Sequence, residues 1–173
     1  MSFQSVAQGW HDFFLTAGAA AATLVGLLFV GLSLHLRTVL ARPEVRALAR
    51  VTLANFTSVL FVALFMLIPQ DARNAGLELQ ITGAVSLAIL IAPLRSAIRS
   101  ETHTLRAAVL TFRLGIAVLC YAATIAAGVL FSNGAIDGPF GAVVAVVMAH
   151  FSFSLRNTWD LLVSVGEAAL GSR

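Results

Sequence analysis

Five long apolar segments alternate with short polar connections along this chain of 173 residues. A helix needs roughly 20 apolar residues to cross the hydrocarbon core of a membrane, and each of the five segments is about that long. Within lipid the backbone must satisfy its own hydrogen bonds, which favours α-helices for such segments. The sequence therefore predicts an all-α, polytopic transmembrane bundle that forms a single domain over residues 1–173. The expected spans are residues 13–36, 51–68, 77–94, 114–131 and 140–163.

The composition agrees with this class of protein. Hydrophobic residues make up 59% of the chain and charged residues 11%, and the mean hydropathy is +0.92. Soluble domains have about 45–50% apolar and about 25% charged residues. The isoelectric point near 10.4 could suggest a nucleic-acid partner. However, the net charge is only +3 and the arginines lie at the ends of the spans, so we expect no nucleic acid.

The arginines are distributed unequally between the two sides of the predicted bundle. The connections 37–50 and 95–113 contain most of them, whereas 69–76 and 132–139 contain only Arg73. The positive-inside rule then places the N-terminus outside and the C-terminus in the cytoplasm. We expect the basic face to contact anionic lipid headgroups, or alternatively to form a vestibule that attracts anions. Its residues are Arg37, Arg42, Arg46, Arg50, Arg95, Arg99, Arg106 and Arg113. Arg113 adjoins the fourth span and is expected at the interface or, alternatively, as a gate charge buried within the membrane.

The last apolar segment contains more polar residues than any other. At 100° per residue, His150, Ser154 and Asn157 share one face of its helix, and Ser152, Arg156 and Asp160 share another. Polar groups within a membrane are costly and are often functional. The candidate pore or polar path therefore comprises residues of this segment and of the second span: His150, Ser154, Asn157, Asn55, Arg156 and Asp160.

Each of these polar groups has more than one interpretation. His150 is expected either to make an interhelical hydrogen bond, to Asn55 or to a Ser or Thr, or to lie on a path for protons or ions. Arg156 and Asp160 are four residues apart and are expected to form an ion pair. Alternatively, Arg156 contributes to a positive ring around the axis of an oligomer.

Small residues recur at helical spacing on the first and last spans. Such residues allow the backbones of two helices to approach closely within a membrane. The sequence therefore predicts helix-packing seams at Gly18, Ala22 and Gly26, and at Gly141, Ala145 and Ala149.

Signals of catalysis and of metal binding are absent from the sequence. It contains no nucleophile elbow, no glycine-rich phosphate loop, no His-Glu-x-x-His and no Cys-x-x-Cys. Its one cysteine, Cys120, excludes an intrachain disulfide and a zinc cluster built from cysteines. We therefore expect no enzymatic activity, no cofactor and no metal.

Residues 16–33 read Thr-Ala-Gly, a run of alanines, Thr-Leu-Val-Gly-Leu-Leu-Phe-Val-Gly-Leu-Ser, and residues 157–163 read Asn-Thr-Trp-Asp-Leu-Leu-Val. These two stretches resemble a family of small multi-span membrane proteins that is common in actinobacteria and has no known activity. Residues 16–33 resemble the first span of that family, with a glycine, a run of alanines, Gly-Leu-Leu-Phe-Val and then a serine. Residues 157–163 resemble its closing pattern, Asn-x-Trp-x-Leu-Leu-Val. The sequence departs from the family pattern at Asp160 and Ser164. The resemblance implies five spans in a bacterial inner (cytoplasmic) membrane and implies no activity.

Two functional hypotheses follow. The first is a homo-oligomeric channel or small transporter with a basic cytoplasmic face. Five spans in 173 residues leave little room for a wide cavity within one protomer, so we expect the path on an axis between protomers. The second is a non-catalytic accessory or regulatory subunit of a larger membrane complex, which would bind a membrane-protein partner through the small-residue seams.

Overall fold

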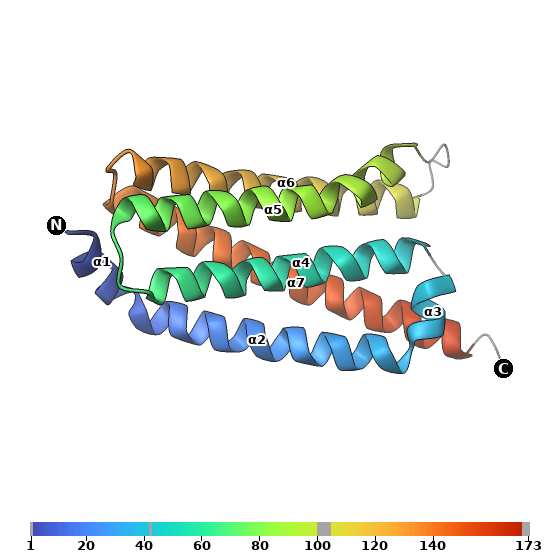
Figure 1. The fold of residues 1–173 in the computed structure, drawn as a ribbon. Coiled ribbons are helices and arrows are strands. Elements are labelled where there is room, and N and C mark those ends of the chain that lie inside the picture. The colour runs from blue at the N-terminus through green and yellow to red at the C-terminus, as the bar shows by residue number, and fades with distance from the viewer. Residues whose placement is uncertain (1, 42, 100–104, 171–173) are drawn as a thin grey trace.

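The computed structural model describes residues 2–41, 43–99 and 105–170. Within these ranges the chain is helical and contains no strand, which confirms the all-α prediction. Figure 1 shows the helices as an elongated bundle. In chain order they are α1 (Phe3–Gly9), α2 (His11–Leu34), α3 (Leu36–Ala41), α4 (Pro43–Leu67), α5 (Ala72–Arg99), α6 (Leu105–Ser132) and α7 (Asp137–Leu170).

Five of the described helices are long and apolar enough to cross a membrane, as predicted. The corresponding segments are His11–Leu34, Val45–Leu67, Ala72–Ile91, Phe112–Ser132 and Asp137–Val163. The third segment begins five residues before the predicted span, and the polar residues at its start have partners. Gln70 Nε2 donates to Glu78 Oε2 over 2.7 Å, and Gln80 Nε2 donates to Ser132 Oγ over 3.0 Å. These five helices indicate a membrane protein.

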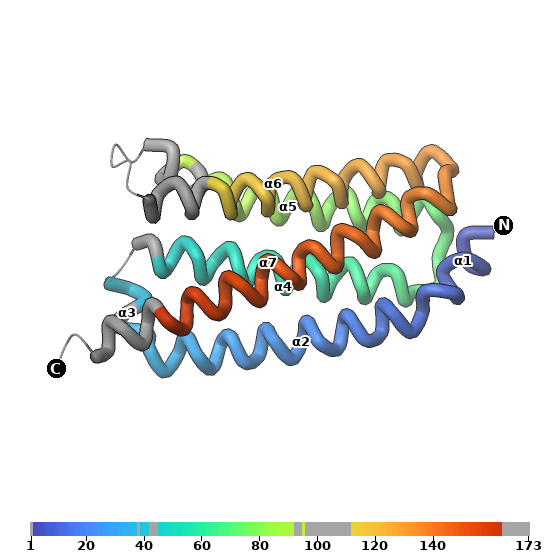
Figure 2. Tube along the Cα trace, turned by 180° about the vertical axis from the view of Figure 1, so that it is seen from behind, coloured from blue at the N-terminus to red at the C-terminus, as the bar shows by residue number. Residues whose placement is uncertain are grey.

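The α4 helix is the most deeply buried of the five spans and lies at the centre of the bundle. It packs against α2, α5 and α7, whereas α5 and α6 form a closely packed pair. The α7 helix runs diagonally, from α6 at the end of the bundle that contains α1 to α2 at the end that contains α3 (Figure 2). We call these the α1 end and the α3 end. Helices α4 and α7 therefore separate α2 from the α5–α6 pair.

The short helices α1 and α3 were not predicted. In α1, Ser2 Oγ accepts a hydrogen bond from the backbone N–H of Ser5 and so caps the helix. The ring of Phe3 is buried against Phe131 and Phe140, with centroid distances of 5.4 Å and 5.1 Å. This aromatic cluster closes the α1 end. The α3 helix occupies part of the predicted connection 37–50 and packs against α4 and α7.

A close approach between α5 and α6 involves glycines outside the predicted seams. A Cβ on Gly76 of α5 would lie 2.5 Å from the carbonyl oxygen of Gly128 of α6. The converse contact, from a Cβ on Gly128 to the Gly76 carbonyl oxygen, would measure 2.6 Å. Neither position has room for a side chain, so these two glycines set the spacing between α5 and α6 at the α1 end.

The predicted seams are only partly used within the chain. Gly18 packs against α4, where an added Cβ would lie 3.2 Å from the Ala63 Cβ. The other members are not buried between helices of this chain, so for them packing against a partner helix stays a prediction. Ala22, Gly26, Gly141 and Ala145 are exposed and Ala149 is half-buried. The buried face of α2 instead contains larger side chains beside Gly18, namely Phe14, Ala17, Ala21 and Leu28.

The α5–α6 contact yields a prediction about stability. We expect Gly76→Ala to lower the free energy of unfolding by about 1–3 kcal/mol, because the new Cβ overlaps the Gly128 carbonyl oxygen. The midpoint of thermal unfolding in detergent should fall by several degrees. Gly26→Ala is the matched control, since its Cβ would have no atom within 4 Å. Equal midpoints for the two variants would contradict the close approach.

Candidate functional site

Buried polar side chains gather midway along the spans, where α4, α6 and α7 meet. None of them is more than 3% exposed. His150 lies midway along the segment Asp137–Val163 of α7. Polar groups at this depth must find partners inside the bundle. We call the set the mid-span polar cluster: Asn55 and Ser58 from α4, Tyr121 and Thr124 from α6, and His150, Ser154 and Asn157 from α7.

A buried hydrogen bond connects α4 to α6 within this cluster. The Tyr121 hydroxyl donates to Asn55 Oδ1 over 2.6 Å. The ring of Tyr121 also lies beside the ring of His150, with centroids 5.0 Å apart. Tyr121 was missed by the sequence analysis. Its position in the sequence could have indicated a special role, because tyrosines of membrane proteins are enriched at the membrane interfaces. Tyr121 lies midway along a span instead.

His150 bonds to its own helix and leaves one ring nitrogen open. Its Nδ1 lies 3.0 Å from the carbonyl oxygen of Val146, which can only accept, so we assign the proton to Nδ1. In the neutral ring Nε2 is then an acceptor. This atom is buried and has no hydrogen-bond partner among the described residues, and the same holds for Ser58 Oγ and Ser154 Oγ. An interhelical hydrogen bond of His150 to Asn55, Ser or Thr is therefore not found among the described residues, because Nδ1 binds its own helix and Nε2 has no partner.

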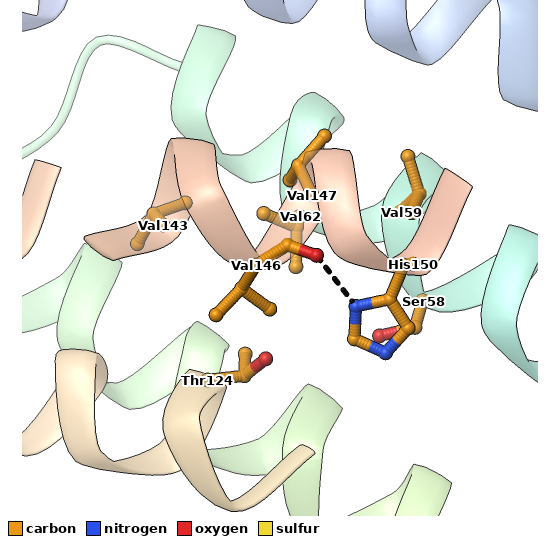
Figure 3. A pocket seen from close by; sticks show the side chains of 8 residues that line it. All are labelled: Ser58, Val59, Val62, Thr124, Val143, Val146, Val147 and His150. Carbon is orange, nitrogen blue, oxygen red and sulfur yellow. Dashed lines mark hydrogen bonds between the residues drawn. The ribbon is translucent and has the colours of Figure 1, made fainter. Parts of the chain in front are cut away.

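Two small cavities lie on either side of His150. The first lies toward the α1 end and is shown in Figure 3. It is lined by His150 together with Ser58, Val59, Val62, Thr124, Val143, Val146 and Val147. The second lies toward the α3 end and is lined by His150 together with Asn55, Arg113, Ile116, Ala117, Cys120, Phe153 and Asn157. His150 is the one described residue that borders both cavities.

Each cavity has a volume of about 10 Å³. This is close to the minimum of about 10–15 Å³ that one water needs. A water is held inside a protein when two to four polar groups surround it. Ser58 and His150, whose Oγ and Nε2 atoms have no hydrogen-bond partner, line the first cavity. Asn55 and Asn157 provide side-chain amide groups in the second cavity. The arrangement therefore suits single bound waters and is too small for an organic ligand.

An ion pair between α6 and α7 stands at the α3 side of the second cavity. The guanidinium of Arg113 donates to the Asp160 carboxylate, and the two side chains are 17% and 36% exposed. The predicted pair of Arg156 with Asp160 is wrong in the described structure, because Asp160 turns toward α6 while Arg156 is exposed. Arg113, expected among the lipid contacts, is instead largely buried in this pair.

The remaining predicted basic residues collect at the α3 end. Arg37, Arg46, Arg50 and Arg95 are exposed there, whereas Arg73 lies at the α1 end. The other three of the predicted set, namely Arg42 and the side chains of Arg99 and Arg106, lie outside the described residues. The described exposed arginines of the predicted basic face therefore lie at one end of the bundle.

The potential metal ligands of the described residues are dispersed. Among these residues no three His, Cys, Asp or Glu side chains come close enough together to hold a metal ion. Cys120 is a buried free thiol beside the second cavity. The chemistry that this site offers is therefore hydrogen bonding, charge and proton exchange by side chains and water.

Comparison with models of protein families, with curated proteins and with solved structures found no match. The resemblance of residues 16–33 and 157–163 to an actinobacterial membrane family stays a prediction.

The Arg113–Asp160 pair yields a second prediction. Arg113→Gln should lower the free energy of unfolding by about 1–3 kcal/mol, because Asp160 loses a charged partner. This is less than the roughly 3–5 kcal/mol of a fully buried pair, since Asp160 is partly exposed to solvent screening. Arg156→Gln on the same helix as Asp160 is the control and should leave the thermal midpoint in detergent unchanged. A larger fall of the thermal midpoint in Arg156→Gln than in Arg113→Gln would contradict the Arg113–Asp160 pair and favour the Arg156–Asp160 pair expected from the sequence.

Proposed function

We propose that the protein is a small channel or transporter of the bacterial cytoplasmic membrane, with a path through the mid-span polar cluster. The observation that supports this most directly is the position of the two cavities, which flank His150 midway along the spans. Intramembrane polar residues that face a cavity commonly mark the route of an ion or substrate. The unpartnered hydroxyl of Ser58 lines the first cavity, and that of Ser154 is buried four residues after His150 on α7.

The proposed path runs inside one protomer and not between protomers. His150, Ser154, Asn157 and Asn55 are each buried within the single chain, so they cannot line an axis shared by several chains. Of the candidates from the sequence, Arg156 is exposed and Asp160 is partly exposed, so these two could face such an axis. The burial of the other four favours an interior path, whether or not the protein self-associates.

We further propose that the α3 end faces the cytoplasm. The exposed residues Arg37, Arg46, Arg50 and Arg95 support this orientation, because arginine-rich connections remain on the cytoplasmic side and bind anionic headgroups. The path would then open toward the cytoplasm near the Arg113–Asp160 pair. On the outer side the buried cluster of Phe3, Phe131 and Phe140 closes it, as hydrophobic constrictions close other channels.

An accessory subunit of a larger membrane complex is the second candidate function. The observation that favours it is the exposed small-residue face of α7 at Gly141 and Ala145. A Cβ on Gly141 would have no atom within 4 Å, so another helix could approach this face closely. This candidate requires a membrane-protein partner that co-purifies reproducibly after mild extraction, and it requires no flux through the isolated chain.

Flux measurements on the full chain in liposomes test the proposed path. We expect the wild type to pass at least one of H⁺, K⁺, Na⁺ or Cl⁻ faster than protein-free liposomes. Ser154→Val should reduce this flux by at least about tenfold, because it replaces a buried hydroxyl of the cluster by a larger apolar group.

The matched control is Ser152→Val, which makes the same change two residues away on the exposed face of α7. It should leave the flux at the wild-type level, and the thermal midpoint of each variant shows that it remains folded. Wild-type flux in folded Ser154→Val would place the path elsewhere. An absence of flux for all four ions would refute the channel or transporter and favour the accessory role.

A further inference from the structure

We propose that the permeant of this path is the proton, and that His150 relays it between a water in the first cavity and a water in the second. This inference rests on the proposed function, since it names what passes through the same cluster. It derives from the size of the two cavities, the charges around them and the position of the open His150 nitrogen.

The size of the cavities favours a small permeant. Each has about 10 Å³, which is room for about one water and no hydration shell. A bare ion would need a ring of oxygen ligands or of charged side chains in place of its shell. The first cavity offers mostly valine side chains and two hydroxyl groups. A proton needs only a short chain of hydrogen-bonded groups.

The charges around the cavities also disfavour a bound ion. Of the titratable side chains near His150, α6 contributes Tyr121, Cys120 and Arg113. The facing residues of α4, Asn55 and Ser58, are neutral. Arg113, the one charged group in either lining, is paired with Asp160 of α7. Because this pair has no net charge, the second cavity attracts neither an anion nor a cation strongly.

His150 has the geometry of a relay. Its Nδ1–H is held by the Val146 carbonyl oxygen, which fixes the ring and leaves Nε2 as the exchanging atom. Figure 3 shows the ring at the edge of the first cavity, with Nδ1 turned toward Val146. The residue also borders the second cavity. Imidazole is the side chain that proteins most often use to shuttle protons.

The relay step balances in protons and bonds. A hydronium in one cavity gives its proton to Nε2, which forms an N–H bond and leaves a neutral water. The imidazolium then gives the same proton to a water in the other cavity and returns to the neutral ring. The Nδ1–H bond and its hydrogen bond to Val146 stay intact, so no further group is needed.

Proton uptake into liposomes that contain the full chain tests the relay. A pH-sensitive dye inside reports the flux, and a K⁺ gradient with valinomycin sets the driving potential. We expect a wild-type proton flux above protein-free liposomes. In His150→Gln this flux should fall by at least about tenfold, while osmotic water permeability stays at the wild-type level. The amide can bind water at the position of Nε2 but cannot pass on a proton.

Two further variants keep the result interpretable. His35→Gln is the matched control and should retain wild-type flux, because the His35 Nδ1 lies 3.2 Å from the carbonyl oxygen of Gly31 in the same i−4 arrangement but outside the cluster. If the glutamine variant unfolds, His150→Asn replaces it in the same flux measurement, since the side-chain N–H of the asparagine can still reach the Val146 carbonyl oxygen.

The outcomes separate this inference from the proposed function. Flux of K⁺, Na⁺ or Cl⁻ without protons would overturn the proton relay and leave the channel or transporter intact. Undiminished proton flux in a folded His150 variant would overturn the role of His150 alone. An absence of flux for every ion tested, including protons, would overturn both.

Discussion

Polar side chains midway along a membrane span have no bulk water to bind, so the bundle has to surround them with protein or with enclosed water. This constraint accounts for the central position of α4 and for the course of α7, because both helices bring polar residues to the same depth. The Tyr121–Asn55 hydrogen bond of 2.6 Å joins α6 to α4 there, and the Tyr121 ring lies against His150 of α7. Three helices therefore meet around one polar cluster, and α2 and α5 pack outside them.

Different interactions close the two ends of this cluster. At the α1 end, Phe3 packs against Phe131 and Phe140, and the contact of Gly76 with Gly128 brings α5 and α6 together. At the α3 end, α7 diverges from α6 toward α2, and the Arg113–Asp160 pair spans the two helices. Two small cavities lie between the aromatic packing on one side and the ion pair on the other. An interior of this kind suits a permeant that moves along hydrogen bonds.

Helical periodicity predicted the faces of single helices, but not the partners of those faces. The five spans follow from segment length, and the shared face of His150, Ser154 and Asn157 is buried as a unit. Asp160 shows what periodicity cannot supply, because its partner Arg113 is 47 residues away and lies on another helix. The same applies to the small residues, since Gly26 and Gly18 both belong to the predicted seam of α2 and only Gly18 meets a neighbour. Which face meets which helix depends on the whole packing arrangement.

An experimental density map of the protein in lipid, at a resolution that shows ordered waters, tests most directly whether the polar cluster forms a wet path inside one protomer. We predict one water within about 3 Å of His150 Nε2 in the first cavity, and a second in the cavity that Asn55 and Asn157 line. Two dry cavities, with Nε2 bonded directly to a side chain of the protein, would contradict it.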